Sequence, residues 1–345
     1  MRAAFLTAVA LLSAALLTFV VGWRIFADYL GKPGSIGKAE PMTVMIAADL
    51  KPEQLGALLS EKGLIAKPDW FTEYLEHFHR KAVVVPGEYA LSASMSPAEI
   101  VDRLVRGAVV TYPVTVAPGS TIRRIAKDIA DQKLAAVEAI EGLATSEKLA
   151  QKLDVPGSSL EGYLFPDTYV FSRDLGAEAL LTKMVERYRK ALPPKVLEDA
   201  RVKGLTENQL VTMASLIETS ALPERDWPLL AGVYHNRLRD GLPLESASAL
   251  SYGLKKEGAL EPADYENESP FNTFLGLGLP PGPIASPSLE ALTAAASPMG
   301  DGRYYAPRGD GTYHFCPDEE CHRLALERAG ITDTDQRPRP RKKRP

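Results

Sequence analysis

Residues 206–218 read Thr206-Glu-Asn-Gln-Leu-Val-Thr-Met-Ala-Ser-Leu-Ile-Glu218, and this stretch decides how the second half of the chain folds. Thr206 and Gln209 form a capping box, in which two side chains satisfy free N–H groups at a helix start. Apolar residues then recur at i, i+3, i+4 and i+7, namely at Leu210, Met213, Ala214 and Ile217. Pro223 must end the helix. The stretch predicts one capped helix whose apolar face packs into a core.

Glu218 lies at i+8 of this pattern, on the same face as the apolar residues. Loss of water disfavours the charged form of a carboxyl group, so Glu218 is a candidate general acid. The other interpretation is structural, with Glu218 in an ion pair with Arg225 or Arg237. The helical pattern alone leaves both interpretations open.

The chain after Glu218 predicts a helical hairpin and then a stiff loop. A second helix is expected from about residue 224 to 240, where Gly241 ends it. Residues 269–287 are rich in proline and lose little freedom on folding. Such a loop suits the wall of a cleft, and a plain connector is the alternative.

A second group of candidate residues lies upstream, in Leu160-Glu-Gly-Tyr-Leu-Phe-Pro-Asp-Thr-Tyr-Val-Phe171. Aromatic rings stack on the faces of sugars, and carboxylates accept hydrogen bonds from sugar hydroxyls. Glu161, Tyr163 and Asp167 are therefore candidate substrate-binding residues. In the alternative interpretation the segment is a core strand whose rings pack inward, and periodicity does not separate the two.

The N-terminus has 21 uncharged residues, Ala3–Trp23, between Arg2 and Arg24. At about 1.5 Å per residue a helix of this length crosses the roughly 30 Å bilayer core. A cleaved signal peptide would have a shorter apolar region of about 7–15 residues and a small-x-small cleavage site. The residues after Trp23 lack such a site. The pattern predicts an uncleaved single-pass anchor.

Composition and charge exclude several classes of protein. The chain is 45% hydrophobic and 24% charged, as in ordinary globular proteins. Six of the 40 basic residues lie in Arg337–Pro345, so residues 1–336 hold 34 basic against 44 acidic residues, a net charge of −10. An acidic body argues against a nucleic-acid partner. Two cysteines exclude a disulfide-built scaffold.

Six ordered blocks carry a resemblance to a known family: Glu161-Gly-Tyr-Leu-Phe-Pro-Asp-Thr-Tyr169, Ala214-Ser-Leu-Ile-Glu218, Glu224-Arg-Asp226, Asn236-Arg-Leu238, Tyr252-Gly253 and Gly278-Leu-Pro-Pro-Gly-Pro-Ile-Ala285. In this order and spacing they resemble the YceG-like (MltG) endolytic murein transglycosylases, membrane-anchored enzymes that cut peptidoglycan glycan strands. The resemblance covers nearly the whole chain.

The resemblance implies an α+β fold with a single N-terminal transmembrane helix, a small LysM-like α/β domain and a mixed α+β catalytic domain. We expect the anchor at 1–26, a linker at 27–41, the LysM-like domain at 42–135, the catalytic domain at 136–332 and a basic disordered tail at 333–345. Strand and helix patterns alternate from Met42 onward, and Ser96 with Glu99 forms a second capping box.

The resemblance also implies a reaction and its residues. The family's enzymes cleave the β-1,4 bond between N-acetylmuramic acid and N-acetylglucosamine and leave a 1,6-anhydromuramyl end. Glu218 matches the catalytic position, where one Glu acts first as acid and then as base. Glu161 would line the same cleft and orient substrate, and Tyr252, Asn236 and Asn272 match further motif positions. No cofactor and no metal are expected for this reaction.

Two departures from the family pattern qualify this implication. Thr219-Ser220 replaces a usual Lys-Glu, and Ala247-Ser248 replaces a usual Asp-Pro. The main alternative is therefore a catalytically weak, membrane-anchored scaffold that binds glycan. A second alternative is a hydrolase that uses Glu161 and Glu218 as a carboxylate pair with water.

A peptidoglycan substrate requires the chain after the anchor to lie outside the cytoplasm, so we expect an N-in, C-out protein of the inner membrane. Peptidoglycan synthases are the expected protein partners. In that compartment Cys316 and Cys321 are expected to form a disulfide. The flanking His314 and His322 leave a zinc site as the alternative.

Overall fold

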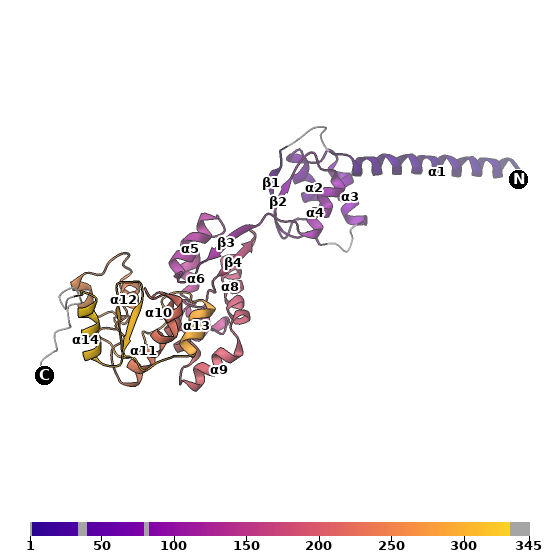
Figure 1. The fold of residues 1–345 in the computed structure, drawn as a ribbon. Helices are drawn as coiled ribbons and strands as arrows, with labels where there is room; N and C mark the ends of the chain where they lie inside the picture. Colours follow the sequence, from indigo (N-terminus) through magenta and orange to yellow (C-terminus); the bar gives the residue numbers. More distant parts are fainter. Residues whose placement is uncertain (1, 34–39, 79–82, 332–345) are drawn as a thin grey trace. The chain divides into compact units, whose positions relative to one another are not determined.

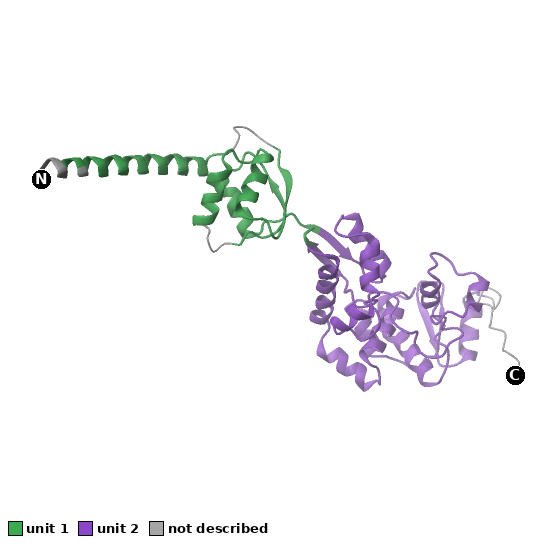
Figure 2. Ribbon diagram, turned by 180° about the vertical axis from the view of Figure 1, so that it is seen from behind, with its two compact units in different colours: residues 1–112, 171–174 green, residues 113–170, 175–345 purple. Residues whose placement is uncertain are grey.

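The computed structural model describes residues 2–33, 40–78 and 83–331, which form two compact units (Figure 2). The first unit comprises Met1–Tyr112 with Phe171–Asp174, and the second comprises Pro113–Val170 with Leu175–Pro345. Helices dominate both units, and each of three small sheets has two strands. The α+β fold class is confirmed. The predicted basic tail, 333–345, lies outside the described residues.

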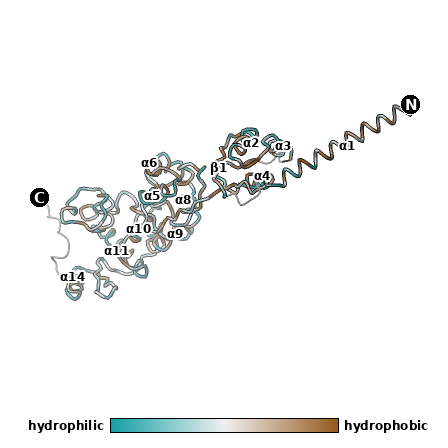
Figure 3. The backbone as a smooth tube through the Cα atoms, turned by 90° about the horizontal axis from the view of Figure 1, so that it is seen from above, coloured by the Kyte–Doolittle hydropathy of each residue, from teal (hydrophilic) through white to brown (hydrophobic). Residues whose placement is uncertain are grey.

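Helix α1 (Arg2–Gly31) opens the first unit (Figure 1). Its segment Val9–Gly31 has a mean hydropathy of 2.0, is unburied, and is long and apolar enough to cross a membrane (Figure 3). The last turns pack against α3, where the rings of Phe26 and Trp70 lie 5.7 Å apart and the Tyr29 hydroxyl donates to the Lys67 carbonyl at 2.9 Å. These contacts stabilise the C-terminal end of α1. The helix therefore extends to Gly31, beyond the expected anchor (1–26) and into the expected linker (27–41).

A small βααβα arrangement follows in the first unit. Its elements are β1 (Met42–Ile46), α2 (Pro52–Glu61), α3 (Pro68–Phe78), β2 (Gly87–Leu91) and α4 (Pro97–Arg106). β1 and β2 pair antiparallel, and their core includes the fully buried rings of Phe71 and Tyr89. The predicted capping box begins α4, since Ser96 Oγ accepts from Glu99 N–H at 3.3 Å and Glu99 from Ser96 N–H at 2.7 Å. The LysM-like character of this unit stays a prediction.

The second unit contains the remaining elements. They are β3 (Tyr112–Val116), α5 (Ile122–Asp131), α6 (Val137–Ala144), α7 (Glu147–Lys152), β4 (Asp167–Phe171), α8 (Ala177–Ala191), α9 (Pro194–Val202), α10 (Glu207–Glu218), η1 (Glu224–Asp226), α11 (Trp227–Arg239), α12 (Ala247–Leu254), η2 (Pro262–Glu266), α13 (Leu289–Ala296), β5 (Tyr304–Pro307), β6 (Tyr313–Cys316) and α14 (Glu319–Arg328). β3 pairs with β4, and β5 pairs antiparallel with β6.

The division between the units differs from the expected boundary at residue 135. The first unit ends at Tyr112, so that β3 and α5 lie mostly or wholly in the second. The reason is long-range packing: β3 pairs with β4, which is far along the chain, and α5 packs against α6.

Helix α10 is the centre of the second unit and contacts α9, α11 and α13 (Figure 1). The predicted capping box forms, with hydrogen bonds of 2.9 Å and 3.2 Å between Thr206 and Gln209. The sequence predicts one buried face on this helix, but every residue from Leu210 to Ile217 is buried. Helices pack on several sides of α10, so its small polar residues Thr212 and Ser215 are buried as well.

Candidate functional site

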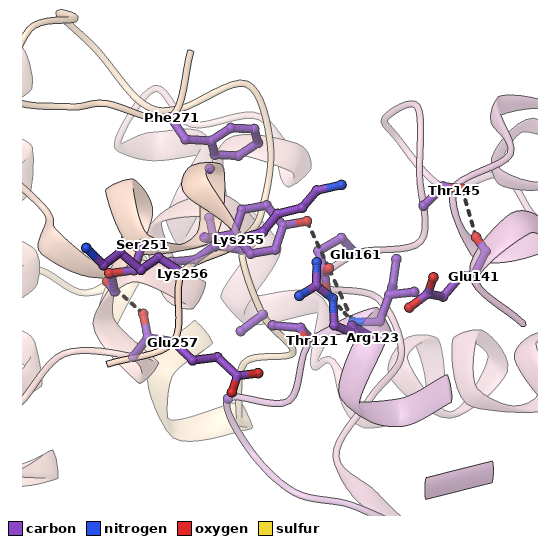
Figure 4. A pocket seen from close by; sticks show the side chains of 18 of the residues that line it. Thr121, Arg123, Glu141, Thr145, Glu161, Ser251, Lys255, Lys256, Glu257 and Phe271 are labelled. Carbon is purple, nitrogen blue, oxygen red and sulfur yellow. Dashed lines mark hydrogen bonds between the residues drawn. The ribbon is translucent and has the colours of Figure 1, made fainter. Parts of the chain in front are cut away.

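The second unit contains a pocket of about 1000 Å³ (Figure 4). Its walls come from the turn that precedes α5, from α6, from α12 and from the proline-rich loop. Figure 4 shows Phe271 and Ser251 on one side and Glu141 and Thr145 on the other, with Glu161 between them. The prediction that the 269–287 loop forms a cleft wall is confirmed, because Phe271, Ile284 and Ala285 line the pocket.

Glu161 lies at the base of this pocket and is only 4% exposed. Its carboxylate accepts a hydrogen bond from the Ile122 N–H at 3.0 Å, in the first turn of α5, and another from the Tyr252 hydroxyl at 2.9 Å. Burial raises the pKa of Glu161 from 4.5 to about 7, although the hydrogen bonds from Tyr252 and Ile122 oppose this shift. Glu161 therefore changes its charge near neutral pH while joining two walls of the pocket.

The backbone beside Glu161 requires glycine. Gly162 has a φ of +84°, and a Cβ there would lie 2.5 Å from Cβ of Pro283. Because only glycine combines this conformation with so close an approach, Gly162 holds the Glu161 segment against the proline-rich loop.

Glu218 is the last residue of α10 and directly precedes Thr219, which lines the same pocket. Its Oε2 accepts the Ser288 N–H at 2.8 Å and the Ser288 hydroxyl at 2.5 Å. Ser288 is the N-cap of α13, so Glu218 sits where free N–H groups point outward. Glu218 is half-buried and is not itself a lining residue, but a Cβ added to the lining residue Gly119 would lie 4.0 Å from the Glu218 Cγ.

The ion-pair interpretation of Glu218 is wrong for this structure. Arg237 pairs with Glu245 at 2.8 Å, and Arg225 donates to the Gly311 carbonyl at 3.3 Å. The Glu218 carboxylate is thus held by a hydroxyl and an amide of a neighbouring helix start.

The two departures from the family pattern meet in space. The Thr219 hydroxyl donates to Ser248 Oγ at 3.0 Å, and Ser248 Oγ lies 3.0 Å from Ser246 Oγ. Both Thr219 and Ser248 line the pocket. Three neutral hydroxyls, those of Thr219, Ser248 and Ser246, therefore follow one another in a chain that begins at the residue after Glu218.

Two predicted substrate-binding residues of the 160–171 segment do not line the pocket. Tyr163 is 1% exposed, its ring packs edge-on against Tyr188, and its hydroxyl donates to the Pro156 carbonyl at 3.1 Å. Asp167 forms an ion pair with Arg187, which holds the pKa of Asp167 below its usual range. Tyr163 thus lies in a turn with its ring packed in the core, and the binding of sugar by Tyr163 and Asp167 stays a prediction.

Two predicted asparagines stabilise loops. Asn236 is buried and its Nδ2 donates to the Gly302 carbonyl at 2.9 Å. Asn272 is buried too, with Nδ2 donating to the Asn267 carbonyl at 2.7 Å and Oδ1 accepting from the Phe274 N–H at 3.0 Å. Neither side chain lines this pocket, and the placement of both in the cleft stays a prediction. Tyr252 and Glu161 are the predicted binding residues that do line it.

Sequence reasoning missed the charged rim of the pocket. Its acidic and basic residues include Arg123, Glu138, Glu141, Lys255 and Glu257. The available signal was the Pro118-Gly119-Ser120 turn before Thr121, whose side chain caps α5. The expected domain boundary at residue 135 places this turn in the small domain, away from the candidate catalytic residues.

A second cluster of side chains lies at the C-terminal hairpin. Cys316 and Cys321 are both free thiols, so the predicted disulfide is absent from this structure. The ligand atoms of His314, Cys316 and Cys321 all lie within 4.8 Å of one another. His322 does not belong to this group, and its ring stacks on Tyr304 with centroids 5.3 Å apart.

Comparisons with known proteins extend these observations. A sequence model of the YceG-like family matches residues 44–328. An endolytic murein transglycosylase of Streptococcus pneumoniae is 30% identical over 92% of this chain and 63% of its own length. The chain thus spans about 63% of the length of that relative.

Two further proteins are similar to the chain. An endolytic murein transglycosylase of Bacillus subtilis is 27% identical over 89% of this chain and 90% of its own length. A crystal structure of a YceG-like protein from Listeria monocytogenes matches with a TM-score of 0.55 and 26% identity, over 82% of this chain and 98% of that one. Since the family match covers both units, the chain belongs to the YceG-like family.

Proposed function

We propose that this protein is an endolytic murein transglycosylase, which cleaves the β-1,4 bond between N-acetylmuramic acid and N-acetylglucosamine in nascent glycan strands and leaves 1,6-anhydromuramyl ends. The observation that carries the proposal is the Glu218 carboxylate, which Ser288 holds in place directly before Thr219, a residue that lines a pocket of about 1000 Å³. The related transglycosylases of Streptococcus pneumoniae and Bacillus subtilis support the same reaction class.

In the proposed mechanism Glu218 acts twice. Its protonated carboxyl group first gives a proton to the glycosidic oxygen as the bond from that oxygen to the anomeric carbon breaks. The resulting carboxylate then takes the proton from the muramyl 6-hydroxyl, whose oxygen closes on the anomeric carbon. Water is not consumed, and Glu218 ends the cycle protonated. The two hydrogen bonds from Ser288 keep Oε2 in place through both steps.

Glu161 acts in this proposal as a positioning residue. Its carboxyl group joins the first turn of α5 to Tyr252 on α12, and both lie in the pocket wall. Burial to 4% exposure keeps Glu161 away from bulk water, and its hydrogen bonds fix the Tyr252 ring beside Phe271, with centroids 5.1 Å apart. The aromatic wall formed by these rings suits the face of a sugar.

Helix α1 is the proposed membrane anchor. Its apolar segment, Val9–Gly31, ends where α1 packs on α3, at Trp23, Phe26 and Tyr29. Aromatic residues favour the interface between membrane and water. We place the protein in the inner membrane with both units outside the cytoplasm, because glycan strands lie there. Peptidoglycan synthases are the proposed partners, since they make the strand that this enzyme cuts.

Product masses test the proposal. Full-length protein in detergent is incubated with glycan strands, and the released fragments are weighed by mass spectrometry. The proposal requires anhydromuramyl ends, which are lighter than reducing ends by one water. Reducing ends would instead establish a hydrolase that uses Glu161 and Glu218, and binding without release would establish the scaffold. Either result would overturn the lyase assignment.

A further inference from the structure

The C-terminal hairpin carries three converging side chains that the proposed reaction does not use. His314 and Cys316 lie two residues apart on β6 and so share one face of the strand. Cys321 lies in the first turn of α14, where its N–H donates to the N-cap Asp318 at 2.8 Å. Strand and helix together bring one nitrogen and two sulfurs within 4.8 Å of one another.

We propose that His314, Cys316 and Cys321 bind one zinc ion. In a tetrahedral zinc site the sulfur lies about 2.3 Å and the nitrogen about 2.0–2.1 Å from the metal, which places adjacent ligand atoms about 3.6 Å apart. Cys321 Sγ lies 3.6 Å from His314 Nε2. The two atoms already have the spacing of neighbouring ligands. Thiolate and imidazole also favour zinc over magnesium or calcium.

Charge and burial fit this assignment. Two thiolates and a neutral imidazole balance the charge of Zn²⁺. Cys316 is fully buried. Zinc binding displaces the proton of each ligating thiol. Cys321 is half-exposed in the first turn of α14, so a metal ion can reach it from solvent. The open fourth position suits water.

Zinc binding at His314 requires the neighbouring Arg308 side chain to move. Arg308 Nη2 lies 2.9 Å from His314 Nδ1, so it donates when that nitrogen carries no proton. Zinc on Nε2 requires the other tautomer, with the proton on Nδ1. Because the Arg308 side chain is exposed, it turns away into solvent at little cost.

Cys316 and Cys321 can either bind zinc or form a disulfide, but not both at once. A disulfide needs the sulfurs about 2.05 Å apart, whereas both cysteines are free thiols here. Zinc would tie the β5–β6 hairpin to α14. That hairpin reaches the segment after Glu218, where the Tyr313 hydroxyl donates to the Ala221 carbonyl at 3.4 Å. The site would thus hold the segment next to the proposed catalytic residue.

The test uses the full-length chain, purified in detergent with a reductant and then stripped of metal by a chelator. Zinc alone is then titrated back, and the bound metal is quantified by elemental mass spectrometry. We expect one zinc per chain and a higher unfolding temperature on binding. Cobalt as a probe should give a sulfur-to-metal charge-transfer band. Cys321→Ser and His314→Gln should each weaken zinc binding by more than about 100-fold, since losing even an outer-shell partner costs about 10–100-fold.

The matched control is His322→Gln, which removes the histidine next to Cys321 and should leave zinc affinity unchanged. Both ligand variants change half-exposed side chains, and their folding is checked by circular dichroism. Zinc affinity that is equal in the wild type and Cys321→Ser would overturn the site. If His322→Gln lost as much zinc affinity as the ligand variants, the three-residue assignment would be overturned. A mass lower by two hydrogens in unreduced protein, with no zinc bound, would establish the disulfide instead.

Discussion

Replacing Glu161 with Gln should remove a pH dependence of stability from the protein. Burial raises the pKa of Glu161 from 4.5 to about 7, so between these pH values the folded state holds a proton that the unfolded state has released. Folding stability must therefore fall as pH rises through this window. At 1.36 kcal/mol for each pH unit, the titration of Glu161 should lower the free energy of unfolding by about 3 kcal/mol between pH 4.5 and pH 8.

The assay is urea unfolding of the full-length chain in detergent, followed by circular dichroism at both pH values. Other groups titrate over the same range, so the quantity of interest is the difference between the pH effects in wild type and Glu161→Gln. That difference should be about 3 kcal/mol, with the wild type losing more stability at high pH. The exposed Glu198→Gln serves as the control and should keep the wild-type pH effect. Equal pH effects in wild type and Glu161→Gln would refute the assignment of a buried, near-neutral carboxyl group.

Three further predictions follow from the same contacts. Tyr252→Phe removes the hydroxyl that donates to Glu161, so the free energy of unfolding in urea should fall by about 1–3 kcal/mol. The loss of this hydrogen bond should also raise the pKa of Glu161 further. An unchanged urea midpoint would contradict the hydrogen bond. Thr219→Val and Ser248→Ala should be coupled in a double-mutant cycle on kcat/KM by about 0.5–1.5 kcal/mol, and additive effects would mean that the hydroxyl pair is irrelevant to turnover. A phosphatase reporter fused after Pro345 should be active, whereas activity of a cytoplasmic reporter there would exclude a cell-wall substrate.

Local sequence signals predicted the elements well. Thr206 with Gln209 and Ser96 with Glu99 both form the capping boxes that their spacing indicated. Such caps depend on residues three apart, so neighbouring chain is enough to specify them. The compact units divide at Tyr112 and not at the expected residue 135, because strand pairing between β3 and β4 joins segments that are distant in sequence.

The site was predicted in part for a related reason. Glu161 and Tyr252 are 91 residues apart, yet the motif match identified both. A motif match does not fix the direction of a side chain, however. Asn236 and Asn272 turn toward loop carbonyls, and Tyr163 turns into the core. The turn before α5 and the cap at Thr121 can be found in the sequence, but that α5 and α6 lie beside Glu161 follows only from the tertiary structure.

The most direct test of the central claim is the rate at which Glu218→Gln releases anhydromuramyl ends from glycan strands. Glutamine keeps the size of the side chain and an oxygen that accepts from Ser288, but it has no proton to transfer. Because one group performs both proton transfers, turnover should fall by at least about 10²–10⁴-fold while glycan binding persists. Glu198→Gln should keep the wild-type rate. Near-normal release by Glu218→Gln, with none from Glu161→Gln, would contradict the account and move the proton transfer to Glu161.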